Sequence, residues 1–298
     1  MKNKYLKFLW VFLFVFSFHF CLRAENPKGI CYWEVEKNGK KSYLLGTMHI
    51  LPGTYIKPLK PKIKSSKYLL VEIDNFKGSD IKLKKAGVFS DGTTLKDHLS
   101  SDSYKKVVSF FEKFGLSEDM ICKFEPWYLG MLAEILQTGL LVDFSSLPMD
   151  VYVIRIAKIY KVKIISLETL DEQINYFDNL PFDVQEAMLL NSIEDNMQKE
   201  FKMMKKSYIE GDIDEIEKML EKETYGKGEK MKEFFDVFIV KRNENMNKKA
   251  IKYLEKGGVF VAVGLGHIIT ENGMVNFLKK RGFKVKRCYV TFNNGEEK

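Results

Sequence analysis

The chain has 298 residues, of which 45% are hydrophobic and 30% are charged. This composition is ordinary for a globular protein with a large buried core, and it excludes a disordered chain. The formal net charge is +8, but no basic stripe is interleaved with aromatic residues, so no nucleic-acid partner is expected.

Residues 1–24 have the pattern of a secretory signal peptide. Lysines precede an apolar run, and Ala24 is the small residue expected before a cleavage site. The apolar run, residues 8–22, is shorter than the roughly 20 residues of a membrane span. We therefore predict export to the periplasm or the cell exterior, with a mature net charge near +4. The alternative is an uncleaved anchor through residues 8–22, and only that alternative would attach the chain to a membrane.

The first part of the mature chain predicts a β-hairpin and a further buried strand. In residues 31–46, CYWEVEKNGKKSYLLG, two strand-like runs flank Asn38-Gly39, which is a strong signal for a tight turn. Residues 68–74, YLLVEID, are apolar until they end in two carboxylates. These segments predict strands of one sheet.

The middle of the chain predicts helices around a third buried strand. Apolar residues recur at helical spacing in residues 103–115, 126–141 and 149–162. Residues 163–169, KIISLET, are the next predicted strand and again carry a carboxylate at their end. From about 171 to 256 the pattern is almost wholly helical.

The last part of the chain returns to strands. Residues 259–267, VFVAVGLGH, and 283–290, FKVKRCYV, predict strands, and a helix is predicted between them. The alternation of strands and helices predicts an α/β fold, with a central, largely parallel sheet, flanking helices and a long helical insertion. We expect one domain over residues 25–298, in which residues 171–256 are mostly a helical elaboration.

Three cysteines remain after the predicted cleavage: Cys31, Cys122 and Cys288. An exported protein could pair two of them in a disulfide and keep one free thiol, and the sequence does not indicate which pair. No CxxC pattern is present, so a structural zinc knuckle is not expected.

One short pattern, a glycine, two residues and a histidine, occurs at the ends of two apolar strands. Gly46 is followed by His49, and Gly264 is followed by His267. If the strands are parallel, their carboxyl ends share one edge of the sheet, where open α/β folds bind ligands. The two imidazoles are then expected to lie close together.

The same edge is predicted to receive carboxylates. One strand ends in Glu72 and Asp74, and another ends in Glu168. Imidazole and carboxylate groups bind zinc, manganese, iron or cobalt, and a catalytic site keeps one position open for water. A carboxylate that is not a ligand could act as a general base. The alternative is a structural role for the histidines, which is the commoner role of a single histidine at a strand end.

Six segments of the chain occur in a characteristic order: YLLGTMH, VEID, EPWYLGML, IISLETLDEQ, KRNENM and FVAVGLGHIITENGMVNFLKKRGFKV. Together they resemble the TraB/PrgY/GumN family, which is similar to the Tiki proteases that cleave Wnt ligands. The resemblance covers residues 29–290, nearly the whole mature chain. It implies that His49, Glu72, Glu168 and His267 are functional.

The resemblance also implies that Arg242 and Asn243 lie in or near the site. A guanidinium at Arg242 would suit an anionic intermediate or a substrate carboxylate, and a helix salt bridge is the alternative role. After the second histidine, the family commonly has a small residue or proline and then a glycine, whereas this chain has Ile268, Ile269 and Thr270. The bulkier side chains of this loop are expected to affect which substrate the site accepts more than whether the site binds a metal.

We therefore expect an exported, metalloprotease-like hydrolase that acts on a peptide or protein. His49, Glu72 and His267 would hold a divalent ion such as manganese, cobalt, zinc or iron. Glu168 would be a further ligand or the general base, and Arg242 would help to stabilise an oxyanion.

Four further residues are expected to line the site: Gly46, Asp74, Asn243 and Gly264. The alternative function is a binding protein that sequesters or inhibits a secreted peptide without turnover. Some members of the family resemble such a protein and act as shields against peptide pheromones.

Overall fold

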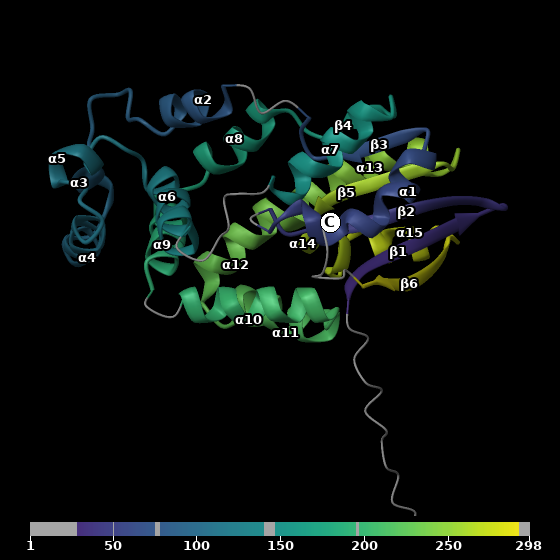
Figure 1. The fold of residues 1–298 in the computed structure, drawn as a ribbon. Helices are drawn as coiled ribbons and strands as arrows, with labels where there is room; N and C mark the ends of the chain where they lie inside the picture. Colours follow the sequence, from purple (N-terminus) through teal and green to yellow (C-terminus); the bar gives the residue numbers. More distant parts are fainter. Residues whose placement is uncertain (1–28, 50, 75–77, 140–146, 195–196, 292–298) are drawn as a thin grey trace, which may run out of the picture.

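The computed structural model describes residues 29–49, 51–74, 78–139, 147–194 and 197–291 (Figure 1). The predicted signal peptide and anchor therefore lie outside the described residues. Six strands form one sheet in the order β4-β3-β5-β2-β1-β6. The strands are β1 (Ile30–Lys37), β2 (Lys40–Thr47), β3 (Tyr68–Val71), β4 (Lys163–Ser166), β5 (Val259–Gly264) and β6 (Lys284–Val290).

The sheet is largely parallel, as the sequence predicts. β2, β5, β3 and β4 pair with one another in parallel. β1 pairs antiparallel with both β2 and β6, so it alone runs against the other five strands. The predicted hairpin joins β1 to β2 at Asn38 and Gly39. Their φ values of 53° and 73° are the left-handed values that this tight turn requires.

Helices make up most of the rest of the chain. The segments between β2 and β4 are η1 (Gly53–Leu59), α1 (Lys60–Ser65), α2 (Ser79–Ala86), α3 (Leu95–His98), α4 (Ser101–Glu112), α5 (Glu118–Ile121), α6 (Pro126–Gly139) and α7 (Met149–Ile159). Those between β4 and β6 are α8 (Leu170–Asp178), α9 (Phe182–Ser192), α10 (Met197–Glu210), α11 (Ile213–Tyr225), α12 (Glu229–Phe235), the π-helix η2 (Asp236–Lys241), α13 (Arg242–Leu254), α14 (Leu265–Ile269) and α15 (Met274–Lys279).

The predicted helical stretch at 171–256 corresponds to α8 through α13 in the described residues. The sequence did not predict α2, the helical turns of η1 and α1, or the short helices α3, α5 and α14, the last of which begins where the strand predicted at 259–267 ends. The segments of α1 and α2 are rich in lysine, Pro58 lies inside η1, and Pro61 stands in the first turn of α1. None of the helices in the described part of the chain combines the length and the apolar character that a membrane crossing requires.

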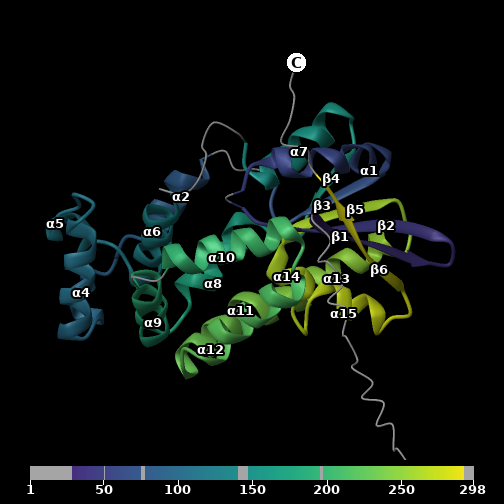
Figure 2. The same cartoon turned by 60° about the horizontal axis from the view of Figure 1, so that its bottom comes forward.

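The helices gather in two places (Figures 1 and 2). One group, α2 to α6 with α9, lies at the end of the molecule away from β6. It has its own apolar cluster, centred on Phe111, Leu129 and Leu189. The larger cluster surrounds the sheet and includes the fully buried β5. The helical elaboration therefore has a second core beside the core of the sheet.

All three described cysteines are free. Cys31 lies opposite Tyr289 on the neighbouring strand, and Cys288 lies opposite Tyr32. Because successive side chains of a strand point to opposite faces of the sheet, the thiols of Cys31 and Cys288 are on different faces and cannot form a disulfide.

Candidate functional site

The carboxyl ends of the four parallel strands lie at one edge of the sheet. β2 is followed by His49, β3 by Glu72, β4 by Glu168, and β5 by His267. The parallel pairing brings these ends together, because neighbouring parallel strands finish at the same edge. Residues up to 218 positions apart in the chain thus meet in one place.

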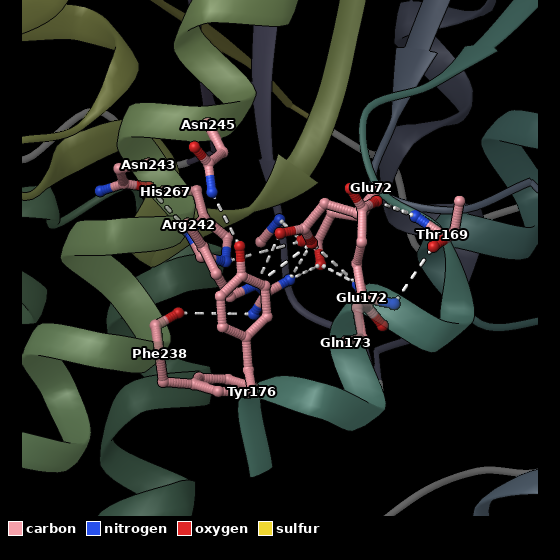
Figure 3. Close-up of polar contacts among 12 residues, drawn as sticks. Glu72, Thr169, Glu172, Gln173, Tyr176, Phe238, Arg242, Asn243, Asn245 and His267 are labelled. Carbon is pink, nitrogen blue, oxygen red and sulfur yellow. Dashed lines mark hydrogen bonds and ion pairs between the residues drawn. The ribbon is translucent and has the colours of Figure 1, made fainter. Parts of the chain in front are cut away.

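Arg242 is the centre of a buried polar network at this edge (Figure 3). Its Nη2 donates to Glu72 Oε2 at 2.8 Å and to Glu168 Oε2 at 2.6 Å, and its Nε donates to both oxygens of Glu168 at 3.0 and 3.1 Å. Gln173 Nε2 donates to the same two carboxylates at 3.2 and 3.1 Å. Both oxygens of Glu168 are therefore engaged, and its side chain is 1% exposed.

Gln173 reaches this network from α8. Thr169 and Glu172 form a capping box that fixes where α8 begins, with the backbone N–H of each residue donating to the other's side chain (Figure 3). The first turn of α8 consequently starts directly after β4. This short connection places Gln173 next to Glu168.

Arg242 is held from the other side by an unusual helix. α12, η2 and α13 are continuous in the chain, and the π-helical η2 ends at Lys241, directly before Arg242. Short π-helical segments inside α-helices occur frequently at functional sites. The guanidinium lies 4.6 Å from the ring centre of Phe238 and 6.0 Å from that of Tyr176. These contacts shield the cation from solvent, and its side chain is 3% exposed.

His267 is buried and oriented by Asn243. Asn243 Oδ1 lies 2.7 Å from His267 Nδ1, and Asn243 Nδ2 donates to Thr270 Oγ1. Because the amide oxygen can only accept, Nδ1 of His267 is the protonated nitrogen and Nε2 is free to bind a ligand. This Nε2 lies 3.9 Å from Glu72 Oε1.

His49 is oriented in the same manner by Asp150, a residue that the sequence analysis did not identify. Asp150 stands in the first turn of α7, and its Oδ2 lies 2.8 Å from His49 Nδ1. Its Oδ1 accepts a hydrogen bond from Thr47 at 2.7 Å. The imidazole of His49 is 63% exposed, so this histidine forms the open side of the site.

Gly264 lies between the histidines and Glu72. A Cβ atom at this position would lie 3.2 Å from Glu72 Oε1, 3.3 Å from His49 Nε2 and 3.5 Å from His267 Cδ2. The backbone N–H of Gly264 also donates to Glu72 Oε1 at 2.7 Å. Its φ of −49° is open to any residue, so glycine serves here to leave space among these three side chains.

Gly46 has a different purpose. A Cβ atom here would lie 2.3 Å from Leu265 Cδ1 and 2.8 Å from Leu265 Cα, because α14 crosses the end of β2 at close range. The carbonyl of Gly46 accepts a hydrogen bond from Tyr208 of α10. The two glycine–histidine patterns are therefore alike in sequence and unlike in structure.

Burial and neighbouring charges shift the pKa values of the three side chains in different directions. Burial acts to raise the pKa of Glu72, but His267, His49 and Arg242 outweigh it and lower the pKa to about 2. Burial lowers the pKa of His267 to about 3. The Asp150 carboxylate raises the pKa of His49 to about 9. At neutral pH, Glu72 is thus ionised, His267 is neutral and His49 is protonated.

The expected residues do not all meet. Asp74 is exposed, because β3 ends at Val71 and the chain bends away after it. In the described part of the chain, no group of three or more His, Cys, Asp or Glu side chains stands close enough to hold a metal ion. The imidazole and carboxylate groups at this edge are of the kinds that bind metals, but in the described structure they lie farther apart than the ligands of a single ion.

The sequence model of the TraB/PrgY/gumN family matches residues 31–287. No curated protein and no solved structure matches the chain significantly.

Proposed function

We propose, given that the chain belongs to the TraB/PrgY/gumN family, that it is an exported, metal-dependent hydrolase of peptides or proteins. The observation that carries the proposal is the meeting of His49, Glu72 and His267 around Gly264. Two imidazoles and a carboxylate are a common ligand set of catalytic divalent metals.

The donor chemistry fits such an ion. Asp150 and Asn243 occupy the Nδ1 atoms of the two histidines, so a ligand would meet the Nε2 atoms. Nε2 of His267 is unprotonated, whereas His49 would release its Nε2 proton when a metal binds. This pairing of a ligand histidine with an acceptor behind it is usual at metal sites. The metal would be manganese, cobalt, zinc or iron, and when bound it would supply Lewis-acid activation of water and of a carbonyl group.

Arg242 and Glu168 act as positioning residues in this proposal. Arg242 is buried between two carboxylates, so it fixes the orientation of Glu72 and has no open path to a substrate. Glu168 gives both its oxygens to Arg242 and Gln173. This arrangement supports Glu168 as the counterion of Arg242 and gives less support to a general base.

The substrate would approach from the side of His49, the exposed residue of the set. The apolar residues of η2 lie near the second glycine–histidine pattern, since Ile239 Cδ1 lies 3.4 Å from the position of a Cβ atom on Gly266. Val237, Phe238 and Val240 are also only half-buried. An extended peptide with apolar side chains suits such a surface.

A non-catalytic peptide-binding protein is the second candidate. The spacing of the donors favours it, because no described group of three is close enough to hold an ion without rearrangement. Both functions would use the same residues, and only a measurement of turnover distinguishes them.

The test is a peptide-library digestion followed by mass spectrometry. Residues 25–298, which include every described residue, would be incubated with manganese, cobalt or zinc. We expect cleavage products that vanish with a chelator and in Glu72→Gln. Glu255→Gln, an exposed carboxylate paired with Lys37, is the matched control and should keep full activity. Peptide binding without cleavage under any metal would contradict the hydrolase and establish the binding protein.

A further inference from the structure

Several stretches of the chain carry many cations and no carboxylate. Residues 51–71 contain five lysines, and residues 151–167 contain three lysines and one arginine. Residues 272–291, which include α15 and β6, are a third such stretch, with four lysines and two arginines. In α10 to α12, by contrast, lysine and glutamate are interspersed.

The fold joins residues 51–71 and 151–167 into one surface. Lys60 and Lys64 of α1 lie over the ring of Tyr160, at the end of α7, at 5.5 and 5.1 Å. At the starts of the neighbouring strands β3 and β4, the backbone N–H of Lys163 donates to the carbonyl of Lys67. Both views place α1 beside α7 (Figures 1 and 2).

We call this surface the basic face, and it is exposed to solvent. Its exposed cations are Lys57, Lys60, Lys64, Lys67, Arg155, Lys158, Lys161 and Lys163. Lys62 is the half-buried member, and it pairs with Glu34 at 3.4 Å. Ile159 stands among these cations with 62% of its surface exposed.

The basic face lies at the end of the sheet opposite the candidate site. Lys67 and Lys163 stand where β3 and β4 begin, whereas Glu72 and Glu168 follow the ends of the same strands. α7 runs from Asp150 at the site to Lys158 at the basic face. A partner bound to this face would leave His49 open.

We propose that the basic face docks the protein on a membrane surface that contains anionic lipids. Clustered lysines are attracted to such a surface, each contributing separately, and an exposed isoleucine among them can enter the headgroup region. Eight of the nine cations are lysines, which act as point charges, whereas base and phosphate recognition favours the arginine fork. The ring of Tyr160 is already covered by Lys60 and Lys64, so it offers no platform for a nucleobase.

The test is co-sedimentation with vesicles, using residues 25–298 so that the apolar run at 8–22 does not contribute. We expect binding to phosphatidylcholine vesicles containing 30% phosphatidylglycerol, no binding to pure phosphatidylcholine, and release by high salt. A variant with Lys64, Lys67, Lys158 and Lys163 changed to glutamine should bind the anionic vesicles at least about tenfold more weakly. Each cation near an anionic surface strengthens binding by roughly fivefold, and the gains from several cations are less than the product of the single effects.

The matched control removes the same charge from the other end of the molecule. Lys84, Lys85, Lys105 and Lys106 are exposed on α2 and α4, and changing these four to glutamine should alter vesicle binding less than about twofold. Thermal unfolding should show that both variants are folded.

Three results would overturn the proposal. The first is no binding of the parent chain to the anionic vesicles. The second is an equal loss of binding in both glutamine variants, which would indicate a response to net charge alone. The third is tighter binding of a DNA oligonucleotide to the basic face than of the vesicles, which would indicate a nucleic-acid site.

Discussion

Arg242 is the side chain on which the buried network depends. It compensates Glu72 and Glu168, which are 11% and 1% exposed. Replacing it with methionine would leave two carboxylates without a cation, and removing one partner of a buried pair typically costs about 3–5 kcal/mol. We therefore predict that Arg242→Met lowers the free energy of unfolding by about that amount in urea titrations.

Lys249 provides the control on the same helix. It pairs with Glu172 at 3.3 Å, and both side chains are about half exposed. Exposed pairs contribute less than about 1 kcal/mol, so Lys249→Met should change the free energy of unfolding by no more than that. Equal effects of the two substitutions would contradict the structural role given to Arg242.

Asp150 should act through His49. It orients the imidazole by its contact with Nδ1, and partners of this type typically change metal affinity 10–100-fold. Asp150→Asn is therefore predicted to weaken manganese, cobalt or zinc binding by about 10–100-fold in calorimetric titrations. Asp171 also stands in the first turn of a helix, and it pairs with the exposed Lys82, far from either histidine in sequence. Asp171→Asn should leave affinity unchanged, and an unchanged Asp150→Asn variant would show that Asp150 does not support a ligand.

Glu125 should make stability depend on pH. Burial, with Asp178 nearby, raises the pKa of its carboxyl to about 7, against an ordinary value of 4.5. Between pH 4.5 and 7 the folded state therefore holds the proton more tightly than the unfolded state, so this contribution to stability is lost as the pH rises through that window. Glu125→Gln, which resembles the protonated form, should flatten the fall in melting temperature over this range. A parallel fall in both chains would contradict the raised pKa.

The ends of β2 and β5 show how one sequence pattern can have two functions. At Gly46 an added methyl group meets the backbone of α14, whereas at Gly264 it meets only the side chains of the site. Gly46→Ala should cost about 1–3 kcal/mol of stability, because the packed backbone must move. Gly264→Ala should cost less than about 1 kcal/mol and reduce metal binding at least tenfold. The geometry would be contradicted if unfolding showed the larger loss of stability in Gly264→Ala and metal titration showed the larger loss of binding in Gly46→Ala.

The strands were predictable because their signals are local. Apolar runs that end in glycine or carboxylates predicted β2, β3, β4 and β5, and the pair Asn38-Gly39 predicted the hairpin. The helices α2 and α1 were not predicted, since their lysine-rich segments have little apolar periodicity. The core strands were therefore enough to predict the fold class, whereas the peripheral helices could not be predicted.

The site as a whole was predictable only in part. The parallel arrangement brought Glu72 and His267 together, as the strand ends indicated. Asp150 and Gln173 were missed because they act across about 100 residues of sequence, from helices whose docking no local pattern specifies. Asp74 was wrongly expected in the site because the sequence did not reveal that β3 ends at Val71. Beyond Val71, the side chains no longer alternate between the two faces of the sheet.

We propose that His49, Glu72 and His267 hold a divalent metal ion. Elemental mass spectrometry of purified residues 25–298, beside the double variant His49→Ala, His267→Ala, measures this binding. We expect about one equivalent of a transition metal in the parent chain and its loss in the double variant. No bound metal in the parent, even after incubation with manganese, cobalt and zinc, would contradict it, and the two histidines would then be structural or peptide-contacting residues.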